Sequence, residues 1–298
     1  MLPGPTVIVG LGGRGRAHLR TLLALGVHPV TAVDHRPDNR AEACRIGATA
    51  TGADLAEAAR QRPPALVVVA TPAADHLAST LAALDLGAAV VVEKPMVDDA
   101  RSVPLLAGVS PDAFVCVAHA ERWNPAVIAV ATALSGAGPV TSARFERCGP
   151  ASPAAAALGC DLDLVVHDVD LAHHLLGPVL IARRRTGEGP GPPARIVLDG
   201  SAGSAVLRIA GRWSDRRYRR LALRCSSGIG LRADLTAGRS WSVDRAGAEV
   251  ELEVGRTPSL TAFWSEVLAA LAGGHGPPVP LAAGLRAVTL ARPSGSSS

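Results

Sequence analysis

The sequence predicts an α/β protein in which a doubly wound parallel sheet is followed by a second, α+β domain containing an antiparallel sheet. In the first hundred or so residues, strand-like runs that are apolar throughout alternate with helical stretches, as expected when helices cover both faces of a parallel sheet. Beyond about residue 120, strand-like runs alternate between apolar and polar residues, which is typical of an antiparallel sheet with one dry face. The length of 298 residues is enough for two domains of ordinary size.

The first domain is expected to span residues 1–120 and to alternate five strands with five helices. The predicted strands are short runs rich in valine and isoleucine, at Thr6–Val9, Pro29–Val33, Ala65–Ala70, Ala89–Val92 and Phe114–Ala118. The predicted helices lie at Gly15–Leu25, Arg40–Ile46, Asp54–Arg60, Asp75–Leu86 and Asp98–Leu106. Such alternation gives each parallel strand a helical connection to the next one.

The second domain is expected to span residues 121–291, and residues 292–298 read as a disordered tail. Its predicted helices are Asn124–Leu134, Leu162–Leu176, Ser259–Leu271 and Leu281–Ala291, and its predicted strands are Ala194–Leu198, Ser204–Ile209, Arg220–Cys225 and Gly230–Leu235. In the third of these strands Leu221, Leu223 and Cys225 face one way and the intervening residues the other.

Composition excludes several classes of function. Aromatic residues are only 3%, and the arginines behind the net charge of +4 are scattered, so no nucleic-acid partner is expected. No run of eighteen apolar residues is free of charge, so no membrane span is expected, and the N-terminus lacks the features of a signal peptide. Five cysteines, an odd number without a CxxC pair, favour a reducing compartment and hence a cytoplasmic location.

A glycine-rich turn follows the first predicted strand, in the sequence Gly10-Leu-Gly12-Gly13-Arg14-Gly15. In a GxGxxG turn the first glycine permits the tight bend, the second lets a pyrophosphate approach the backbone, and the third lets the helix pack close to the sheet. The helix N-terminus then offers N–H groups and a positive dipole to the phosphates. We therefore predict a Rossmann domain that binds a dinucleotide here, with Gly13 and Arg14 included in the site.

Asp34 ends the second predicted strand, nineteen residues after Gly15. A carboxylate at this place accepts hydrogen bonds from the adenosine ribose, which favours NAD. Arg36 lies two residues further on and could instead meet the 2′-phosphate of NADP. Because Asp34 would repel that phosphate, NAD is the expected cofactor, with NADP left open through Arg36.

A second cluster, Glu93-Lys94-Pro95, comes directly after the strand Ala89–Val92. Ligands of a doubly wound sheet bind at the carboxyl ends of its strands, so Lys94 is expected where nicotinamide and substrate meet. Lys94 is the only lysine in the chain, while the other 29 basic residues are arginine. A lysine can hydrogen-bond a substrate hydroxyl and can lose its proton when desolvated, which an arginine cannot. The alternative is a solvated surface lysine, and a cis peptide at Pro95 is a further option.

A third cluster is Asp163-Leu-Val-Val-His167, within a predicted helix. Residues four apart share a helix face, so the Asp163 carboxylate can orient the His167 imidazole and make it a general acid or base. The alternative is a buried His–Asp pair with a structural role. No metal site is expected, because no third and fourth ligand are spaced to match.

These clusters, in this order, resemble the Gfo/Idh/MocA oxidoreductase family. The resemblance rests on VIVGLGGRGRAH with His18, on VVVATPAADH around Thr71, Pro72 and His76, on VVEKP, and on DLVVHDVDL. It implies a Rossmann domain joined to a C-terminal α+β domain on an open, mostly antiparallel sheet. It further implies that Thr71, Pro72, His76 and Glu93 join the cofactor site, and that Lys94, Asp163 and His167 form the catalytic trio.

A finer resemblance lies in His119-Ala-Glu-Arg122-Trp123-Asn124-Pro-Ala-Val. This segment is similar to HxERFNPAV in the family branch of UDP-N-acetylglucosamine 3-dehydrogenase-like proteins, with Trp123 in place of phenylalanine. The resemblance makes Arg122, Trp123 and Asn124 candidates for substrate contact, together with Lys94, Asp163 and His167. Alternatively, Asn124 simply caps the helix that follows.

The expected function is hydride transfer between a nicotinamide and a ring carbon of a sugar or nucleotide sugar, for example C3 of a UDP-linked amino sugar. Two alternatives stay open: an oxidoreductase of a non-sugar substrate such as an imine, a dihydrodiol or a cyclitol, and a non-catalytic dinucleotide-binding regulatory protein. Arg144 and Arg147 could contact a phosphate of the substrate. A homo-oligomer, a dimer or tetramer formed through an exposed sheet face, is also expected.

Overall fold

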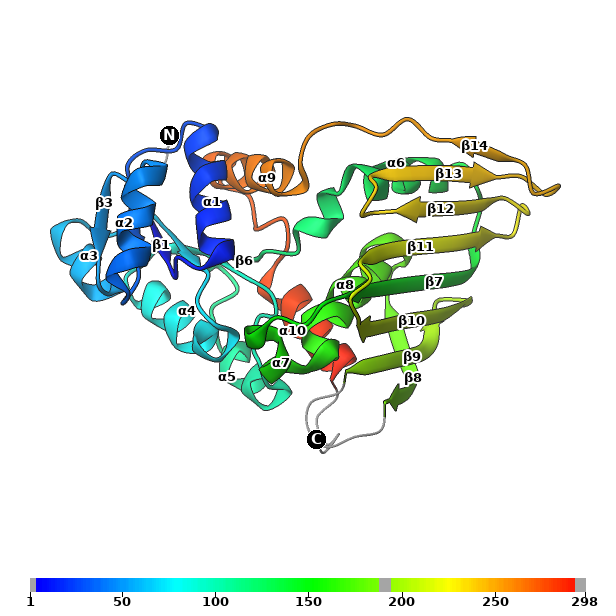
Figure 1. The fold of residues 1–298 in the computed structure, drawn as a ribbon, viewed down its shortest axis with the longest axis horizontal. Helices are drawn as coiled ribbons and strands as arrows, with labels where there is room; N and C mark the ends of the chain where they lie inside the picture. Colours follow the sequence, from blue (N-terminus) through cyan, green and yellow to red (C-terminus); the bar gives the residue numbers. More distant parts are fainter. Residues whose placement is uncertain (1–3, 188–193, 293–298) are drawn as a thin grey trace. The chain divides into compact units, whose positions relative to one another are not determined.

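The computed structural model describes residues 4–187 and 194–292, so residues 293–298 of the tail expected at 292–298 lie outside the described residues. The chain divides into two compact units. The first comprises Met1–His119 and Leu260–Leu285, and the second comprises Ala120–Ser259 and Arg286–Ser298. Each unit contains one sheet (Figure 1).

The sheet of the first unit has six parallel strands in the order β3-β2-β1-β4-β5-β6. The strands are β1 (Thr6–Val9), β2 (Val30–Val33), β3 (Ala50–Gly52), β4 (Leu66–Val69), β5 (Ala89–Val92) and β6 (Val115–Val117). This strand order is that of a Rossmann fold. All four residues of β4 are buried, which is why its sequence is apolar on both faces. The predicted doubly wound parallel sheet is therefore confirmed.

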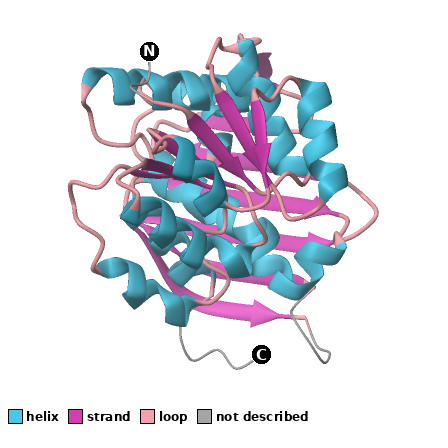
Figure 2. Ribbon diagram, turned by 90° about the vertical axis from the view of Figure 1, so that its left-hand side faces the viewer, coloured by secondary structure: helices cyan, strands magenta, loops and turns pink. Residues whose placement is uncertain are grey.

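Helices cover the strands of this sheet (Figure 2). Those that pack on its strands are α1 (Gly13–Ala24), α2 (Pro37–Ile46), α3 (Leu55–Gln61) and α4 (His76–Asp85). The unit also contains α5 (Val103–Ala107), α9 (Ser259–Gly273) and the beginning of α10 (Leu281–Ala291). Side-chain hydrogen bonds stabilise the N-terminus of α3. The Asp54 carboxylate accepts from the Glu57 amide at 2.7 Å, and the Glu57 carboxylate accepts from the Ala53 amide at 2.7 Å. These two bonds cap α3 in the manner of a capping box.

The C-terminal segment 260–285 packs with the first unit, whereas the sequence placed it in a second domain of residues 121–291. The reason lies in contacts that span most of the chain. The Val117 amide donates to the Val279 carbonyl at 2.9 Å, and the Trp264 indole donates to His18 at 2.9 Å. A sequence pattern predicts helices but not partners this distant in sequence. The helices of this segment could therefore be predicted, but the unit with which they pack could not.

The sheet of the second unit has eight strands in the order β14-β13-β12-β11-β7-β10-β9-β8. They are β7 (Val140–Gly149), β8 (Val179–Thr186), β9 (Arg195–Ala202), β10 (Ala205–Trp213), β11 (Tyr218–Cys225), β12 (Gly230–Asp234), β13 (Arg239–Val243) and β14 (Glu249–Glu251). Every neighbouring pair is antiparallel except β7 with β10, which is parallel. The expected open, mostly antiparallel sheet is confirmed.

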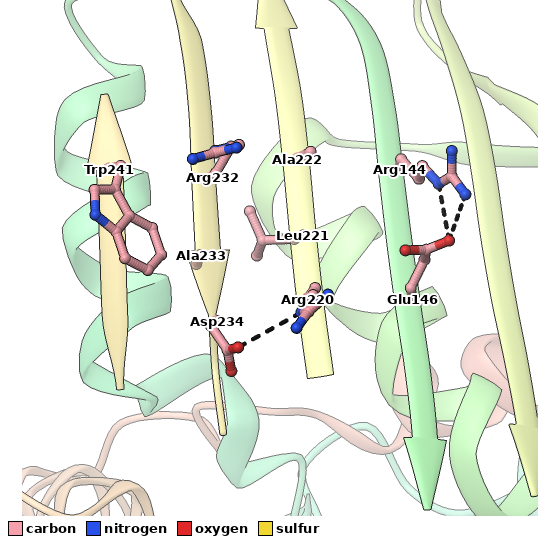
Figure 3. A pocket seen from close by; sticks show the side chains of 9 residues that line it. All are labelled: Arg144, Glu146, Arg220, Leu221, Ala222, Arg232, Ala233, Asp234 and Trp241. Carbon is pink, nitrogen blue, oxygen red and sulfur yellow. Dashed lines mark hydrogen bonds and ion pairs between the residues drawn. The ribbon is translucent and has the colours of Figure 1, made fainter. Parts of the chain in front are cut away.

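Helices α6 (Pro125–Leu134) and α8 (Val166–Leu176) pack on this sheet, and α7 (Pro153–Cys160) precedes a π-helical turn at Asp161–Val165 that leads into α8. The alternation predicted for β11 is confirmed, since Leu221, Leu223 and Cys225 are buried. Figure 3 shows charged side chains and Trp241 lining a hollow of about 310 Å³ on the sheet. Among the described residues, no helix has the length and apolar character needed to cross a membrane.

Candidate cofactor and substrate sites

The turn between β1 and α1 requires glycine at two positions. Gly10 has φ of +90°, and a Cβ atom there would lie 2.6 Å from the Ala70 carbonyl oxygen and the Thr71 amide nitrogen. A Cβ on Gly15 would lie 1.8 Å from the Gly10 carbonyl oxygen. These contacts bring the start of α1 against the ends of β1 and β4, as the GxGxxG pattern predicts.

The N-terminus of α1 is open to an anion. Its cap residue, Gly12, provides no side-chain hydrogen bond, and the first turn contains no acidic residue. No atom outside the immediate neighbours lies within 4 Å of a Cβ placed on Gly12 or Gly13. Backbone N–H groups, the helix dipole and the adjacent Arg14 therefore present positive charge at a position with room for a pyrophosphate.

Asp34 follows β2 and is tied to the glycine-rich turn. Its carboxylate accepts from the Leu11 amide at 2.8 Å, the Arg36 amide at 2.8 Å and the Asn39 side chain at 3.0 Å. Burial alone would raise the pKa of Asp34, but these hydrogen bonds outweigh it and lower the pKa below its ordinary value. Asp34 is thus an anion at neutral pH, which suits a ribose diol and opposes a 2′-phosphate. The exposed Arg36 is next to it.

His76 joins two loops at the carboxyl ends of β4 and β5. Its Nε2 lies 2.9 Å from the Thr71 carbonyl oxygen and its Nδ1 lies 2.8 Å from the Pro95 carbonyl oxygen. The side chain is buried, and burial lowers its pKa below the ordinary value. A neutral imidazole donates to only one of the two carbonyls. Pro72, beside Thr71, is exposed, whereas Thr71 is half-buried.

Glu93 is a buried anion that holds the backbone of Lys94. Its carboxylate contacts His18 Nε2 at 2.9 Å and accepts from the Lys94 amide at 3.1 Å. Burial acts to raise the pKa of Glu93, but the hydrogen bond and the charge of His18, followed by the charges of Arg14 and Lys94, lower it to about 2. The peptide between Lys94 and Pro95 is cis, and the Lys94 side chain is half-buried at the end of β5.

In the second unit, Asp163 and His167 lie on one continuous helical segment. Asp163 belongs to the π-helical turn and His167 to the first turn of α8, and both are half-buried. The Trp213 indole, at the end of β10, donates to the Asp163 carboxylate at 3.0 Å. The four-residue spacing in a helical segment keeps both side chains on one side of it.

Three other carboxylates anchor this segment, each to arginine. Asp161 is fully buried and pairs with Arg184 at 2.8 Å and with Arg292. The remaining pairs are Asp168 with Arg147 at 2.8 Å and Asp170 with Arg122 at 2.5 Å. These ion pairs fix the helical segment that carries His167 to β7, to β8 and to the short helix before α6. Among the described residues, no cluster of histidine, cysteine and carboxylate side chains could hold a metal ion.

Arg147 is the buried centre of a larger network. It also contacts Glu121 at 3.3 Å, and Glu121 accepts from Arg219 at 3.0 Å. Burial works against the charge on Arg147, but Asp168 and Glu121 outweigh it and raise the pKa of the guanidinium. Burial raises the pKa of Asp168 above its ordinary value, although the charge and hydrogen bonds of Arg147 act to lower it. The phosphate contact considered for Arg147 is wrong, because the side chain is buried and paired.

Two of the residues considered for substrate contact use their polar atoms within the protein. Arg122 donates twice to Asp170, from Nε at 2.8 Å and from Nη2 at 2.5 Å. Asn124 caps α6 by accepting from the Ala126 amide at 3.1 Å, and its side chain donates to the Leu235 carbonyl at 3.3 Å. Trp123, between them, is half-buried. The capping alternative for Asn124 therefore has direct geometric support.

The structure brings the predicted residues together in two groups. The first unit contains the glycine-rich turn, the Thr71-Pro72 loop, Asp34, Arg36, His76, Glu93 and Lys94, and the second contains Arg122, Trp123, Asn124, Asp163 and His167. Two tryptophans that contact these residues could not be expected from the sequence: Trp213, which donates to Asp163, and Trp264, which donates to His18. No local spacing signals them, because they lie 50 and 246 residues from Asp163 and His18.

The fold and the glycine-rich turn together define an NAD-binding Rossmann domain. Residues 5–108 match a family model described as oxidoreductase family, NAD-binding Rossmann fold, of the Gfo/Idh/MocA group. Residues 5–108 are thus similar to the Rossmann domain of the Gfo/Idh/MocA oxidoreductase family, in agreement with the resemblance found in the motifs.

Two curated relatives match parts of the chain. UDP-N-acetylglucosamine 3-dehydrogenase of Acidithiobacillus ferrooxidans is 28% identical over 189 residues, which are 61% of this chain and 57% of that protein. The 4-carboxy-2-hydroxymuconate-6-semialdehyde dehydrogenase of a Sphingobium species (strain SYK-6) is 31% identical over 122 residues, which are 40% of this chain and 39% of that protein. The matched stretch is thus less than two thirds of either relative.

Solved structures share the fold over almost the whole chain. The UDP-N-acetylglucosamine 3-dehydrogenase of Acidithiobacillus ferrooxidans has a TM-score of 0.84 at 20% identity, covering 98% of this chain and 96% of that one. A levoglucosan dehydrogenase in complex with NADH and levoglucosan has a TM-score of 0.84 at 16% identity, covering 96% of this chain and 95% of that one. At this identity the likeness establishes the fold.

Proposed function

We propose that the chain is an NAD(H)-dependent dehydrogenase or reductase of a ring hydroxyl in a sugar or nucleotide sugar. The observation that carries the proposal is the bond between Glu93 and His18, which links the Lys94 loop to the helix of the glycine-rich turn. It supports Lys94 as a catalytic residue at the carboxyl end of a parallel sheet, beside the N-terminus that suits a dinucleotide phosphate.

The residues present fit a nicotinamide dinucleotide. The open N-terminus of α1, with Gly12, Gly13 and Arg14, would hold the pyrophosphate, and the anionic Asp34 would accept from the ribose diol. The backbone of the loop that His76 ties together would border the nicotinamide end. When bound, the nicotinamide supplies or accepts a hydride at C4. Asp34 favours NAD over NADP, as the sequence suggested.

The proposed catalytic work is shared by three side chains. His167 takes the proton of the reacting hydroxyl during oxidation and returns it during reduction. Asp163, held by Trp213, orients the imidazole and the substrate. The Lys94 ammonium hydrogen-bonds the reacting oxygen and stabilises the charge that develops there. Positioning of substrate and cofactor supplies much of the remaining rate acceleration.

A nucleotide-linked sugar oxidised at C3 is the proposed substrate class. Supporting this are the similarity to a UDP-N-acetylglucosamine 3-dehydrogenase and the segment from Arg122 to Asn124 that is similar to that branch. We assign direct substrate contact to Trp123, while Arg122 and Asn124 orient the segment through Asp170 and α6.

We further propose that two copies of the chain associate through the sheet face shown in Figure 3. Sedimentation analysis tests this proposal.

A second candidate is a dehydrogenase of a non-sugar substrate. It is favoured by the 31% identity to the 4-carboxy-2-hydroxymuconate-6-semialdehyde dehydrogenase. Such an enzyme would need the same acid–base residues and the same cofactor site, but no site for the nucleotide portion of a substrate. Competitive inhibition by UDP therefore separates the two candidates.

The test is a panel of nucleotide sugars, sugar phosphates, free polyols and cyclic hemiacetals, followed through nicotinamide absorbance with NAD and NADP. Lys94→Arg and His167→Asn should lower kcat for any active substrate by about 10²- to 10⁴-fold without changing NADH affinity more than a few-fold. His174→Ala, at an exposed position of the same helix, is the matched control and should stay active. Full activity of both variants would remove the catalytic assignment of Lys94 and His167, whereas a parent protein that binds NADH but turns over no substrate would favour the non-catalytic alternative.

A further inference from the structure

We infer that His18 is a positioning residue for Lys94, acting through Glu93 and oriented by Trp264. This inference rests on the proposed function of Lys94. It concerns a chain of side chains from three separate elements: Trp264 on α9, His18 on α1, and Glu93 at the end of β5. All three are buried, so the chain of contacts is shielded from water.

The contacts form an unbroken series of hydrogen bonds. The Trp264 indole donates to His18 Nδ1 at 2.9 Å, and the two rings meet edge to face with centroids 5.6 Å apart. His18 Nε2 lies 2.9 Å from one carboxylate oxygen of Glu93. The other carboxylate oxygen accepts from the Lys94 amide at 3.1 Å. Each group therefore orients the next one, ending at the peptide that carries the Lys94 side chain.

The Trp264 contact fixes which nitrogen of His18 carries the proton. An indole N–H can only donate, so Nδ1 must accept and is unprotonated. The proton is then on Nε2, which donates to Glu93. His18 therefore accepts from Trp264 at one ring nitrogen and donates to Glu93 from the other. Around Glu93 the remaining charged or titratable groups are Arg14, Lys94 and His76.

A purely structural role would explain the burial of these residues but not the direction of the bonds. Glu93 has two carboxylate oxygens, and one is bound to the donor on α1 while the other is bound to the Lys94 amide. If the donor is lost, the buried carboxylate must turn toward another donor, such as Arg14, and the Lys94 peptide loses its acceptor. Displacing a catalytic group by about 1 Å lowers the rate by up to about 100-fold.

The first experiment measures the His18 tautomer by ¹⁵N NMR of histidine-labelled protein. We expect the Nε2–H tautomer of a neutral ring at pH 7, with Nδ1 at the shift of an acceptor. Trp264→Phe removes the indole N–H and should free Nδ1 to take a proton. A His18 imidazolium in the parent protein, or an unchanged His18 signal in Trp264→Phe, would overturn the inference.

The second experiment uses the single lysine of the chain. Protein labelled with ¹⁵N-lysine gives one backbone amide signal, from the Lys94 N–H that bonds to Glu93. His18→Gln reaches the position of Nε2 and keeps a donor to Glu93, whereas His18→Asn reaches only the position of Nδ1. We expect an upfield shift of the Lys94 amide signal and a loss of about 10- to 100-fold in kcat in His18→Asn, and near-parental values in His18→Gln.

Equal shifts and equal activity losses in both His18 variants, or no shift in either, would overturn the positioning role. Thermal unfolding of both variants serves as the control, because a merely structural role would lower Tm alike in the two. Glu93→Gln provides a second approach if His18→Asn does not fold: it too should shift the Lys94 amide. If the amide responds as expected but no substrate is turned over, the hydrogen-bonded chain stands and the proposed function fails.

Discussion

Trp213 donates its indole N–H to the carboxylate of Asp163 at 3.0 Å. Trp213 ends β10, whereas Asp163 lies in the π-helical turn before α8, so the bond joins the sheet of the second unit to its proposed catalytic helix. It orients the Asp163 carboxylate, which precedes His167 by four residues, or about one helical turn. A tryptophan is an effective orienting group because its N–H donates, cannot accept and does not titrate.

Trp213→Phe keeps the ring and removes this donor. We expect kcat to fall about tenfold with substrate KM little changed, because the bond orients a residue of the chemical step, while the free energy of unfolding falls by about 1 kcal/mol. Trp241→Phe, on β13, is the control and should leave kcat unchanged. Unaltered kcat in Trp213→Phe would mean that Asp163 is oriented by other contacts.

Arg147→Met should strongly destabilise the second unit. It leaves Asp168 buried without its main partner, and breaking a buried ion pair from one side costs about 3–5 kcal/mol. Arg144→Met, three residues earlier on β7, breaks an exposed pair with Glu146 and should cost at most about 1 kcal/mol. Urea unfolding measures both. Similar losses in the two variants would show that the buried network contributes no more than a surface pair.

Five of the six strands of the first sheet could be predicted from the sequence, because burial of both faces makes them apolar throughout, whereas β3 has two exposed residues and lacks this signal. The second sheet could not be predicted in full. Its central strand, β7, was missed because Arg147 occupies an inward position and breaks the apolar alternation, although Ala143 and Phe145 on the same side are buried. β8 contains three consecutive arginines, and α7 is largely alanine in an alanine-rich chain. The short strands β3, β13 and β14 were also missed.

The candidate sites, too, could be predicted from the sequence only in part. The glycine-rich turn, Asp34 and Lys94 are predictable because each follows its strand directly, so strand order determines their place. The buried arginines and tryptophans that orient site residues are not predictable, because their partners are distant in sequence. Arg122 illustrates the difference: it was singled out by resemblance for substrate contact, and the structure pairs it with Asp170, 48 residues away.

Asp34→Asn should reduce the preference for NADH over NADPH. The carboxylate is anionic in the folded protein and repels a 2′-phosphate, while an amide of the same shape does not. We expect the ratio of the NADPH and NADH dissociation constants to fall at least about tenfold, as measured by fluorescence titration. Arg36→Ala is the companion variant and should weaken only NADPH. Tighter binding of NADPH than NADH by the parent protein would contradict the proposed cofactor.

Glu93 should make folding stability depend on pH in the acid range. Its pKa is about 2 in the folded protein against an ordinary value of 4.5, so the folded state binds the proton less tightly than the unfolded state. The resulting stabilisation is fully present above pH 4.5 and is lost as the pH falls toward 2. From these two pKa values, about 2 kcal/mol of it should disappear between pH 6 and pH 3.

Glu93→Gln separates this effect from the titration of other carboxylates. The glutamine variant is less stable than the parent at pH 6, because the anion that accepts from His18 and from the Lys94 amide is lost. Since glutamine does not titrate, the difference in unfolding free energy between parent and variant should shrink by about 2 kcal/mol at pH 3. Urea unfolding at the two pH values measures it. A difference that stays constant would mean that the pKa of Glu93 is the same in the folded and unfolded states, so that the bonds from His18 and the Lys94 amide do not favour its anion.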